Sequence, residues 1–188
     1  LRILAMAVAS GYATQDVYDF CRTYAHRHVL ATKGEVIQAG KPVLSRPSWQ
    51  DVNHRGQKLK RGVQLWHVGT DTSKERLYRR LDLTVPGPGY QHFPRGLPDE
   101  YFEQLTSEKL IRKRGRGLEK REWVNTRERN EALYLKILCY AAAIYAGLQR
   151  VNWQQLRQTI NPEQKDLFAA PPAPGLRAEA SPETAGAG

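Results

Sequence analysis

The sequence predicts a single α/β domain in which a mixed sheet is flanked by helices. The chain has 188 residues, a length that suits one domain with a substantial core. A near-continuous apolar run at residues 3–9 is typical of a strand buried on both faces. An amphipathic stretch and a second short apolar segment at residues 29–32 follow it. This β-α-β order predicts two parallel neighbouring strands joined by a right-handed crossover.

The amphipathic stretch between these strands predicts a helix that begins at Thr14. A threonine can cap a helix through its hydroxyl group, and Asp16 would favour the positive end of the helix dipole. The spacing i, i+3, i+4, i+7 predicts a face packed on the sheet by Val17, Phe20, Cys21 and Tyr24.

Residues 35–61 show no clear period and predict a long surface loop. An apolar pattern returns at residues 62–69 and predicts another strand. Thr72 and Glu75 then match a capping box, which predicts a helix through Leu81. Asp71 lies at the junction of this strand and helix.

The second half of the chain predicts six further segments. Pro, Gly and capping signals and apolar spacing delimit them: a short strand at 90–93, a helix at 98–105, strands at 109–114 and 118–124, a long helix at 130–148 and a short helix at 153–160. Residues 169–188 are poor in large apolar groups and predict a disordered tail. We therefore expect one domain at residues 1–168.

The two cysteines predict a protein from a reducing compartment. Cys21 and Cys139 both fall on expected apolar helix faces, which argues against a disulfide frame or a zinc site. No apolar run approaches the roughly 18 residues that a membrane helix needs. Because the chain begins at Leu1 and not at Met, we expect it to be a fragment of a longer protein.

The charge balance points to a polyanionic partner. The chain carries 29 Lys and Arg against 19 Asp and Glu, a formal net charge of +10, which favours a nucleic-acid partner. Two basic clusters are expected to contact DNA phosphates: Lys58, Lys60 and Arg61 in the predicted loop, and Arg112, Lys113, Arg114, Arg116, Lys120 and Arg121 at a hairpin tip. The alternative is that both clusters are only solvated surface.

Phosphodiester hydrolysis by two divalent metals needs carboxylates that converge from different elements. The candidates are Asp71 after a predicted strand and Glu131 in the first turn of the long helix. The alternative is that each only favours the start of its helix. The five histidines form no ligand pattern, and the chain has neither a Walker A motif nor a dinucleotide-binding glycine fingerprint.

Five motifs in order carry a resemblance to a known family: ASGYATQDVYDFC, GVQLWHVGTDTSKERLYRRL, PGPGYQHFP, EYFEQLTSEKL and RNEAL. They resemble the C-terminal nuclease domain of lambda-type phage terminase large subunits, from about Ala7 to Leu148. The resemblance implies a ribonuclease H-like fold, whose first strands we expect to be truncated in this chain, and cutting of viral DNA during packaging with Mg²⁺ or Mn²⁺. It also implies double-stranded DNA, the terminase small subunit and the portal or prohead as partners, an ATPase motor earlier in the full chain, and the host cytoplasm as location.

The resemblance transfers to this chain only in part. The family carries Asp before Ser-Gly-Tyr, where this chain has Ala9, and its last motif ends in Asp, where this chain has Tyr134. Glu131 keeps its motif position. The resemblance places a further carboxylate upstream of Leu1. It therefore implies a vacated metal site, in which Ala9 and Glu131 approach each other and the Tyr134 ring faces the same cleft.

Three hypotheses follow from the residues and the resemblance. The first is a metal-dependent DNA endonuclease domain that is inactive in this chain, unless Asp71 and Glu131 still hold a metal. The second is a non-catalytic DNA-binding or docking domain. The third is a defective prophage remnant without a selected function.

Overall fold

The computed structural model describes residues 3–35, 41–115 and 118–153, and the side chains of all of these except 113–115 and 118–120. Chain contacts separate residues 1–149 from residues 150–188, and the fold described below is that of residues 1–149. Its helices and strands are β1 (Met6–Ala9), α1 (Thr14–Thr23), β2 (Val29–Glu35), β3 (Ser48–His54), β4 (Gln57–Gly69), α2 (Thr70–Leu81), α3 (Asp99–Leu105), β5 (Glu108–Gly115), β6 (Leu118–Asn125) and α4 (Glu131–Tyr145), with a short 3₁₀ turn at Ala25–Arg27 and another that begins at Leu148.

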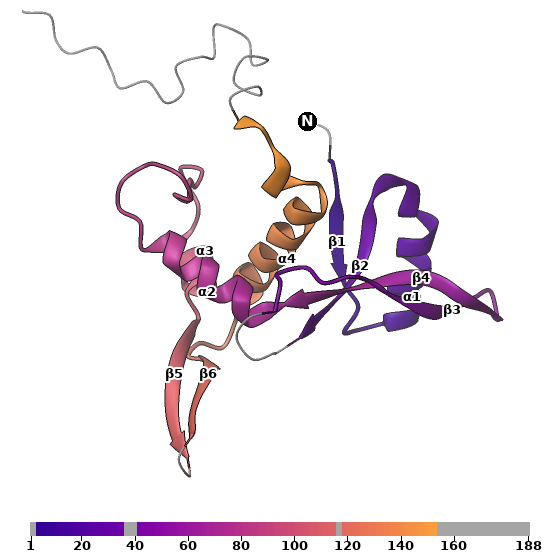
Figure 1. The fold of residues 1–188 in the computed structure, drawn as a ribbon, viewed down its shortest axis with the longest axis horizontal. Coiled ribbons are helices and arrows are strands. Elements are labelled where there is room, and N and C mark those ends of the chain that lie inside the picture. The colour runs from indigo at the N-terminus through magenta and orange to yellow at the C-terminus, as the bar shows by residue number, and fades with distance from the viewer. Residues whose placement is uncertain (1–2, 36–40, 116–117, 154–188) are drawn as a thin grey trace, which may run out of the picture. The chain divides into compact units, whose positions relative to one another are not determined.

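A four-stranded mixed sheet forms the centre, with strand order β1-β2-β4-β3 (Figure 1). β1 pairs with β2 in parallel, with Met6 opposite Val29, and β2 pairs with β4 in parallel, with Ala31 opposite Leu65. β3 runs antiparallel to β4. The predicted β-α-β unit is confirmed, although its first strand begins at Met6 and not at residue 3, and its second strand continues to Glu35 and does not end at residue 32. The prediction that the first strand is buried on both faces was wrong, because Ile3, Leu4 and Met6 are 78%, 65% and 45% exposed.

Helices α1 and α4 pack on opposite faces of this sheet. Side chains of a strand alternate between the two faces. Val8 packs on a cluster that includes Tyr18 and Cys21 of α1, whereas Ala7 and Ala9 pack on the cluster that contains α4. The mixed α/β fold class predicted from the sequence is therefore confirmed.

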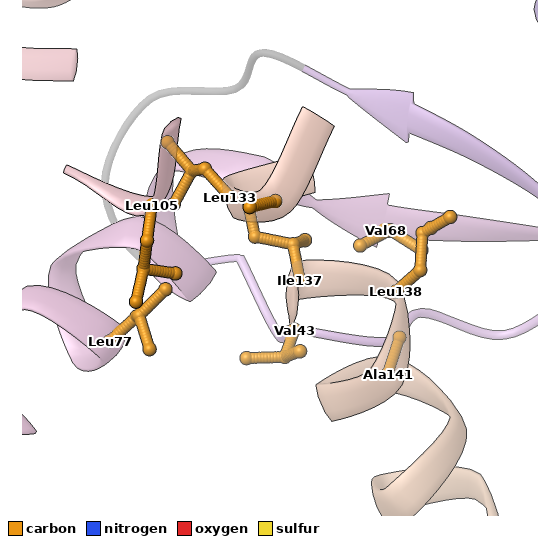
Figure 2. Close-up of a cluster of buried hydrophobic side chains, with 9 residues drawn as sticks. Val43, Val68, Leu77, Leu105, Leu133, Ile137, Leu138 and Ala141 are labelled. Atoms are coloured by element: carbon orange, nitrogen blue, oxygen red, sulfur yellow. The ribbon is translucent and has the colours of Figure 1, made fainter. Parts of the chain in front are cut away.

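The larger core cluster lies between the sheet, α2, α3 and α4 (Figure 2). Leu133 and Ile137 of α4 are each 1% exposed, and they meet Val68 of β4, Leu77 of α2 and Leu105 of α3. Their spacing of four residues places Leu133 and Ile137 on one side of α4.

The prediction of a loop at residues 35–61 was wrong, because β3 and the first part of β4 form a hairpin there. Polar side chains obscure the alternation, since the outer part of this hairpin is largely exposed. The predicted strand at 62–69 is the last part of the 13-residue β4.

The predicted caps and part of the predicted face of α1 were also wrong. Ala13 precedes α1 and Gly69 precedes α2, and neither helix has a side-chain cap. The hydroxyl of Thr14 donates to the carbonyl of Ser10, four residues back. Phe20 and Tyr24 are 42% and 39% exposed, and their rings contact each other at a tilt, with ring centres 4.9 Å apart.

The second half of the chain follows the prediction more closely. The helix at α3, the hairpin of β5 and β6 and the long helix α4 are all present. The predicted strand at residues 90–93 is absent, since this segment lies without regular structure after a Pro-Gly turn. The predicted helix at 153–160, the tail at 169–188 and the domain end at 168 lie outside the described residues, apart from Trp153. None of the helices in the described part is long and apolar enough to cross a membrane.

Candidate functional site

The carboxyl ends of β1, β2 and β4 meet at one edge of the sheet. Ala9 lies opposite Thr32, and Glu35 lies opposite Gly69. In sheets with parallel strands, ligands commonly bind at this edge, because loops and helix starts converge there. The candidate site is therefore expected at this edge.

Tyr134 of α4 occupies part of this edge. A Cβ atom placed on Gly34 would lie 3.8 Å from the Tyr134 hydroxyl and 3.1 Å from the methyl group of Thr70. Ala9 and Tyr134 both pack against the core cluster that contains α4. Burial raises the pKa of the Tyr134 phenol, so the ring is neutral at ordinary pH.

Glu35 is a carboxylate at this edge that the sequence alone did not indicate. Its Oε1 lies 2.5 Å from Nδ1 of His67, and its Oε2 lies 3.8 Å from Nζ of Lys41. Nε2 of His67 lies 3.0 Å from the hydroxyl of Ser48, whereas its buried Nδ1 meets Glu35 at ion-pair distance but makes no hydrogen bond of regular geometry.

Asp71 lies in the first turn of α2, beside a buried polar cluster. Burial is the main cause that raises the pKa of Asp71; Lys74 opposes the shift, and Glu108 adds to it. Lys74 Nζ lies 2.5 Å from Oε2 of Glu108, and Asn130 donates to the other Glu108 oxygen at 3.3 Å. This cluster joins α2, β5 and the residue before α4.

Glu131 lies at the start of α4 and is directed to solvent and to Arg129. Its two carboxylate oxygens lie 3.3 and 3.5 Å from Nε of Arg129. The pKa of Glu131 is lowered, first by a hydrogen bond from its own backbone N–H at the helix start and also by Arg129. Asn130, the residue before α4, thus contacts Glu108 in the polar cluster beside Asp71. Glu131, the first residue of α4, instead forms an exposed ion pair with Arg129.

The residues that the structure describes do not assemble a recognisable metal centre. In residues 3–35, 41–115 and 118–153, no three His, Cys, Asp or Glu side chains lie close enough together to hold a metal ion. Glu35 and Glu108 are already bound by cations, and Ala9 and Tyr134 supply no carboxylate. The roles predicted for Asp71 and Glu131, and the approach of Ala9 to Glu131, stay predictions.

The residues predicted to bind DNA lie on two hairpins. Lys58, Lys60 and Arg61 belong to β4, are exposed, and lie beside Asp51, which Lys58 contacts at 3.2 Å. In the hairpin of β5 and β6, Arg112 is exposed and lies opposite Arg121, which pairs with Glu75 of α2 at 3.2 Å. The backbone register places Lys113 opposite Lys120 and Arg114 opposite Glu119. Arg116 and the side chains of the other tip residues lie outside the described part.

Glu35 and Glu108 were missed for different reasons. Glu35 could have been found from the β-α-β pattern if the second strand had been extended by three residues, because the last residue of such a strand reaches the functional edge. Glu108 has no such position in a β-α-β unit that could have indicated it from the sequence. It begins a strand of the separate hairpin, and only tertiary packing brings it close to Lys74.

Comparison with known proteins identifies the family to which this chain belongs. The family described as "Terminase large subunit gpA, endonuclease domain" matches residues 1–153. The chain belongs to this terminase endonuclease family. The resemblance derived from the five motifs is therefore confirmed, and the mixed α/β sheet flanked by helices is consistent with a ribonuclease H-like nuclease fold.

Two relatives support the same assignment to the terminase endonuclease family. The chain is 36% identical to "Terminase, large subunit" of Escherichia phage lambda over 161 residues, which cover 81% of this chain and 22% of that protein. It is 32% identical to "Terminase, large subunit" of Enterobacteria phage P21 over 176 residues, which cover 85% of this chain and 26% of that protein. The chain thus spans about a quarter or less of each relative. No solved structure matches it.

Proposed function

We propose that this terminase endonuclease domain binds duplex DNA and that its cleavage centre is incomplete in this chain. The observation that supports the proposal is the pair Ala9 and Tyr134 at the carboxyl edge of the sheet. Tyr134 supplies a neutral ring beside Gly34 and Thr70, where the family resemblance implies a carboxylate.

The proposal follows from the charge that metal-dependent hydrolysis requires. When bound, Mg²⁺ or Mn²⁺ would stabilise the charge that develops on the phosphate and would activate water. Neutral side chains cannot replace the charge of missing carboxylates. The two candidate carboxylates have different surroundings: burial raises the pKa of Asp71, whereas Glu131 is exposed and paired with Arg129.

DNA binding does not depend on that centre. The net charge of +10 and the exposed cations of the two hairpins favour contacts with phosphate groups, which carry little sequence information. We expect micromolar or weaker affinity for duplex DNA, with little sequence preference. A terminase small subunit, a portal and a prohead are the further partners that the family implies for a complete large subunit in the host cytoplasm.

A plasmid-nicking assay tests the proposal. The purified chain is incubated with supercoiled plasmid and Mg²⁺ or Mn²⁺, with EDTA as the reference, and duplex binding is measured by fluorescence anisotropy in parallel. We expect salt-sensitive binding and no nicking above the EDTA reference. Metal-dependent nicking that is lost in Glu131→Gln or Asp71→Asn, and retained in Arg79→Gln, would show that the centre is active. A chain that neither nicks nor binds duplex DNA would refute the binding part of the proposal.

A further inference from the structure

A small pocket lies between α2 and α4, and its lining includes none of the candidate catalytic residues. Its volume is about 200 Å³, below the roughly 300–1,000 Å³ of most sites for drug-sized ligands. Leu77 and Ile137 form an apolar part of the lining, and Arg80, Lys136 and Gln91 supply polar groups. The volume suits a single small group, and the donors of Arg80, Lys136 and Gln91 suit a group with several hydrogen-bond acceptors.

The cations of this pocket are held by aromatic rings. The Arg80 guanidinium lies 4.9 Å from the centre of the Tyr140 ring, and Lys136 Nζ lies 5.3 Å from the centre of the Phe93 ring. Such contacts orient a cation without neutralising it. Within the described part of the chain, neither Arg80 nor Lys136 has a carboxylate within ion-pair distance.

Other cations of the domain, in contrast to Arg80 and Lys136, pair with carboxylates. Lys74, Arg127 and Arg129 each pair with a carboxylate, on Glu108, Glu103 and Glu100 respectively. Arg76 and Arg80 instead share one neutral acceptor, the Tyr140 hydroxyl, at 3.4 and 3.5 Å. These are long hydrogen bonds, so both guanidinium groups keep donors for an added anion.

The chemistry of these donors defines the class of ligand. A guanidinium fork matches two oxygens of a tetrahedral oxyanion, and a lysine adds a point charge. Arg80 and Lys136 are half-buried beside Leu77 and Ile137, so an anion there is less screened by water than on an open surface. We propose that the pocket between α2 and α4 binds a phosphate group, supplied either by a DNA backbone or by a small phosphate compound.

The pocket contains a thiol that can report its occupancy. Cys139 lines the pocket and is exposed, contrary to the prediction that it lies on an apolar face of α4. The other cysteine, Cys21, is buried, and burial raises the pKa of its thiol to about 11, so it reacts slowly. Alkylation of the folded chain by N-ethylmaleimide, an uncharged reagent, therefore follows Cys139.

The experiment measures the alkylation rate with inorganic phosphate, pyrophosphate or a short DNA duplex, against chloride at equal ionic strength. At an anion concentration twice its dissociation constant, occupancy of the pocket slows alkylation about threefold. We expect this protection in the wild-type chain and in Arg79→Gln, whose side chain is exposed on the same helix and does not line the pocket. We expect it to be lost in Arg80→Gln/Lys136→Gln, or in Lys136→Gln alone if the double variant does not fold.

The arms of the experiment separate the two sources of phosphate. Protection by the duplex that disappears in the Arg80→Gln/Lys136→Gln variant assigns the pocket to a DNA backbone. Protection by phosphate or pyrophosphate alone assigns it to a small phosphate compound. If no anion protects Cys139, or if the variant keeps full protection, the pocket is not a phosphate site. The duplex arm rests on the proposed duplex binding, whereas the phosphate and pyrophosphate arms do not, and no arm depends on DNA cleavage.

Discussion

Single carboxylates in this domain differ in how fully their charge is compensated. Glu108 is 7% exposed, and its two oxygens contact Lys74 and Asn130. Glu131 is exposed and pairs with Arg129 alone in the first turn of α4. A buried carboxylate depends on its partners far more than an exposed one does, because water cannot replace them.

This contrast leads to a prediction for Lys74. The Lys74→Met change leaves the buried Glu108 carboxylate without its cation and close to Asp71, so we expect the free energy of unfolding to fall by about 3–5 kcal/mol. Urea denaturation measures this change. The matched control is Lys58→Met, because Lys58 is 74% exposed where it pairs with Asp51; its effect should stay within about 1 kcal/mol. Equal effects of the two changes would show that the Lys74 pair is not a buried interaction.

At the scale of elements, α4 connects the sheet to the other helices. It packs on β1 and α3, and its residues form much of the larger core cluster (Figure 2). Its amino end is held by Gln104 of α3, which accepts a hydrogen bond from the backbone N–H of Ala132 at 3.2 Å. Stability of the domain should therefore depend on the inward side of this helix and little on its outward side.

Two leucines of α4 test this expectation. Leu133 is 1% exposed, whereas Leu135, two residues later on the same helix, is 60% exposed. We expect Leu133→Ala to lower the free energy of unfolding by about 2–5 kcal/mol, because it removes buried methyl groups and leaves a cavity. Leu135→Ala should change it by about 0.5 kcal/mol or less. A large effect of Leu135→Ala in urea denaturation would mean that another surface covers that side of the helix.

At the scale of the whole molecule, the excess of positive charge is the main property that bears on DNA. Several cations are neutralised by neighbours, as Arg121 is by Glu75. Others, including Arg112 and Lys60, are exposed. The location of the un-neutralised charge decides whether DNA binds at one face or diffusely.

Charge reversal in the hairpin of β5 and β6 tests where DNA binds. The change to Glu is made at Arg112, Lys113, Arg114 and Arg116. We expect weaker duplex binding, and a slope of log affinity against log salt that falls by about 0.9 for each DNA phosphate that the variant no longer neutralises. Anisotropy titrations at several salt concentrations measure both quantities.

The control for this variant carries the same change of charge at four exposed positions elsewhere: Arg22, Arg27, Arg79 and Arg95. It should lower the affinity through the general field but leave the slope closer to that of the wild type. If both variants change the slope equally, the hairpin is not the phosphate-binding element.

The amino-acid sequence alone is enough to predict the parallel pair of β1 and β2, the helix between them and the long helix α4. These elements are encoded by apolar spacing and by signals that lie a few residues apart, so their type and order can be predicted without knowledge of distant contacts. It also determined the family, because five ordered motifs extend over most of the chain. Ala9 and Tyr134 could be recognised as departures from the family pattern for the same reason.

Which charged groups lie close together depends on how distant segments of the chain pack. The hairpin of β3 and β4 escaped prediction because its exposed strands lack an apolar alternation. Glu108 meets Lys74 across 34 positions, and Arg80 meets Tyr140 across 60, through contacts between elements that no local pattern records. Charge pairing acts through space over a few ångströms, so the partner of a side chain, and hence its availability to a ligand, is set only when distant segments pack together.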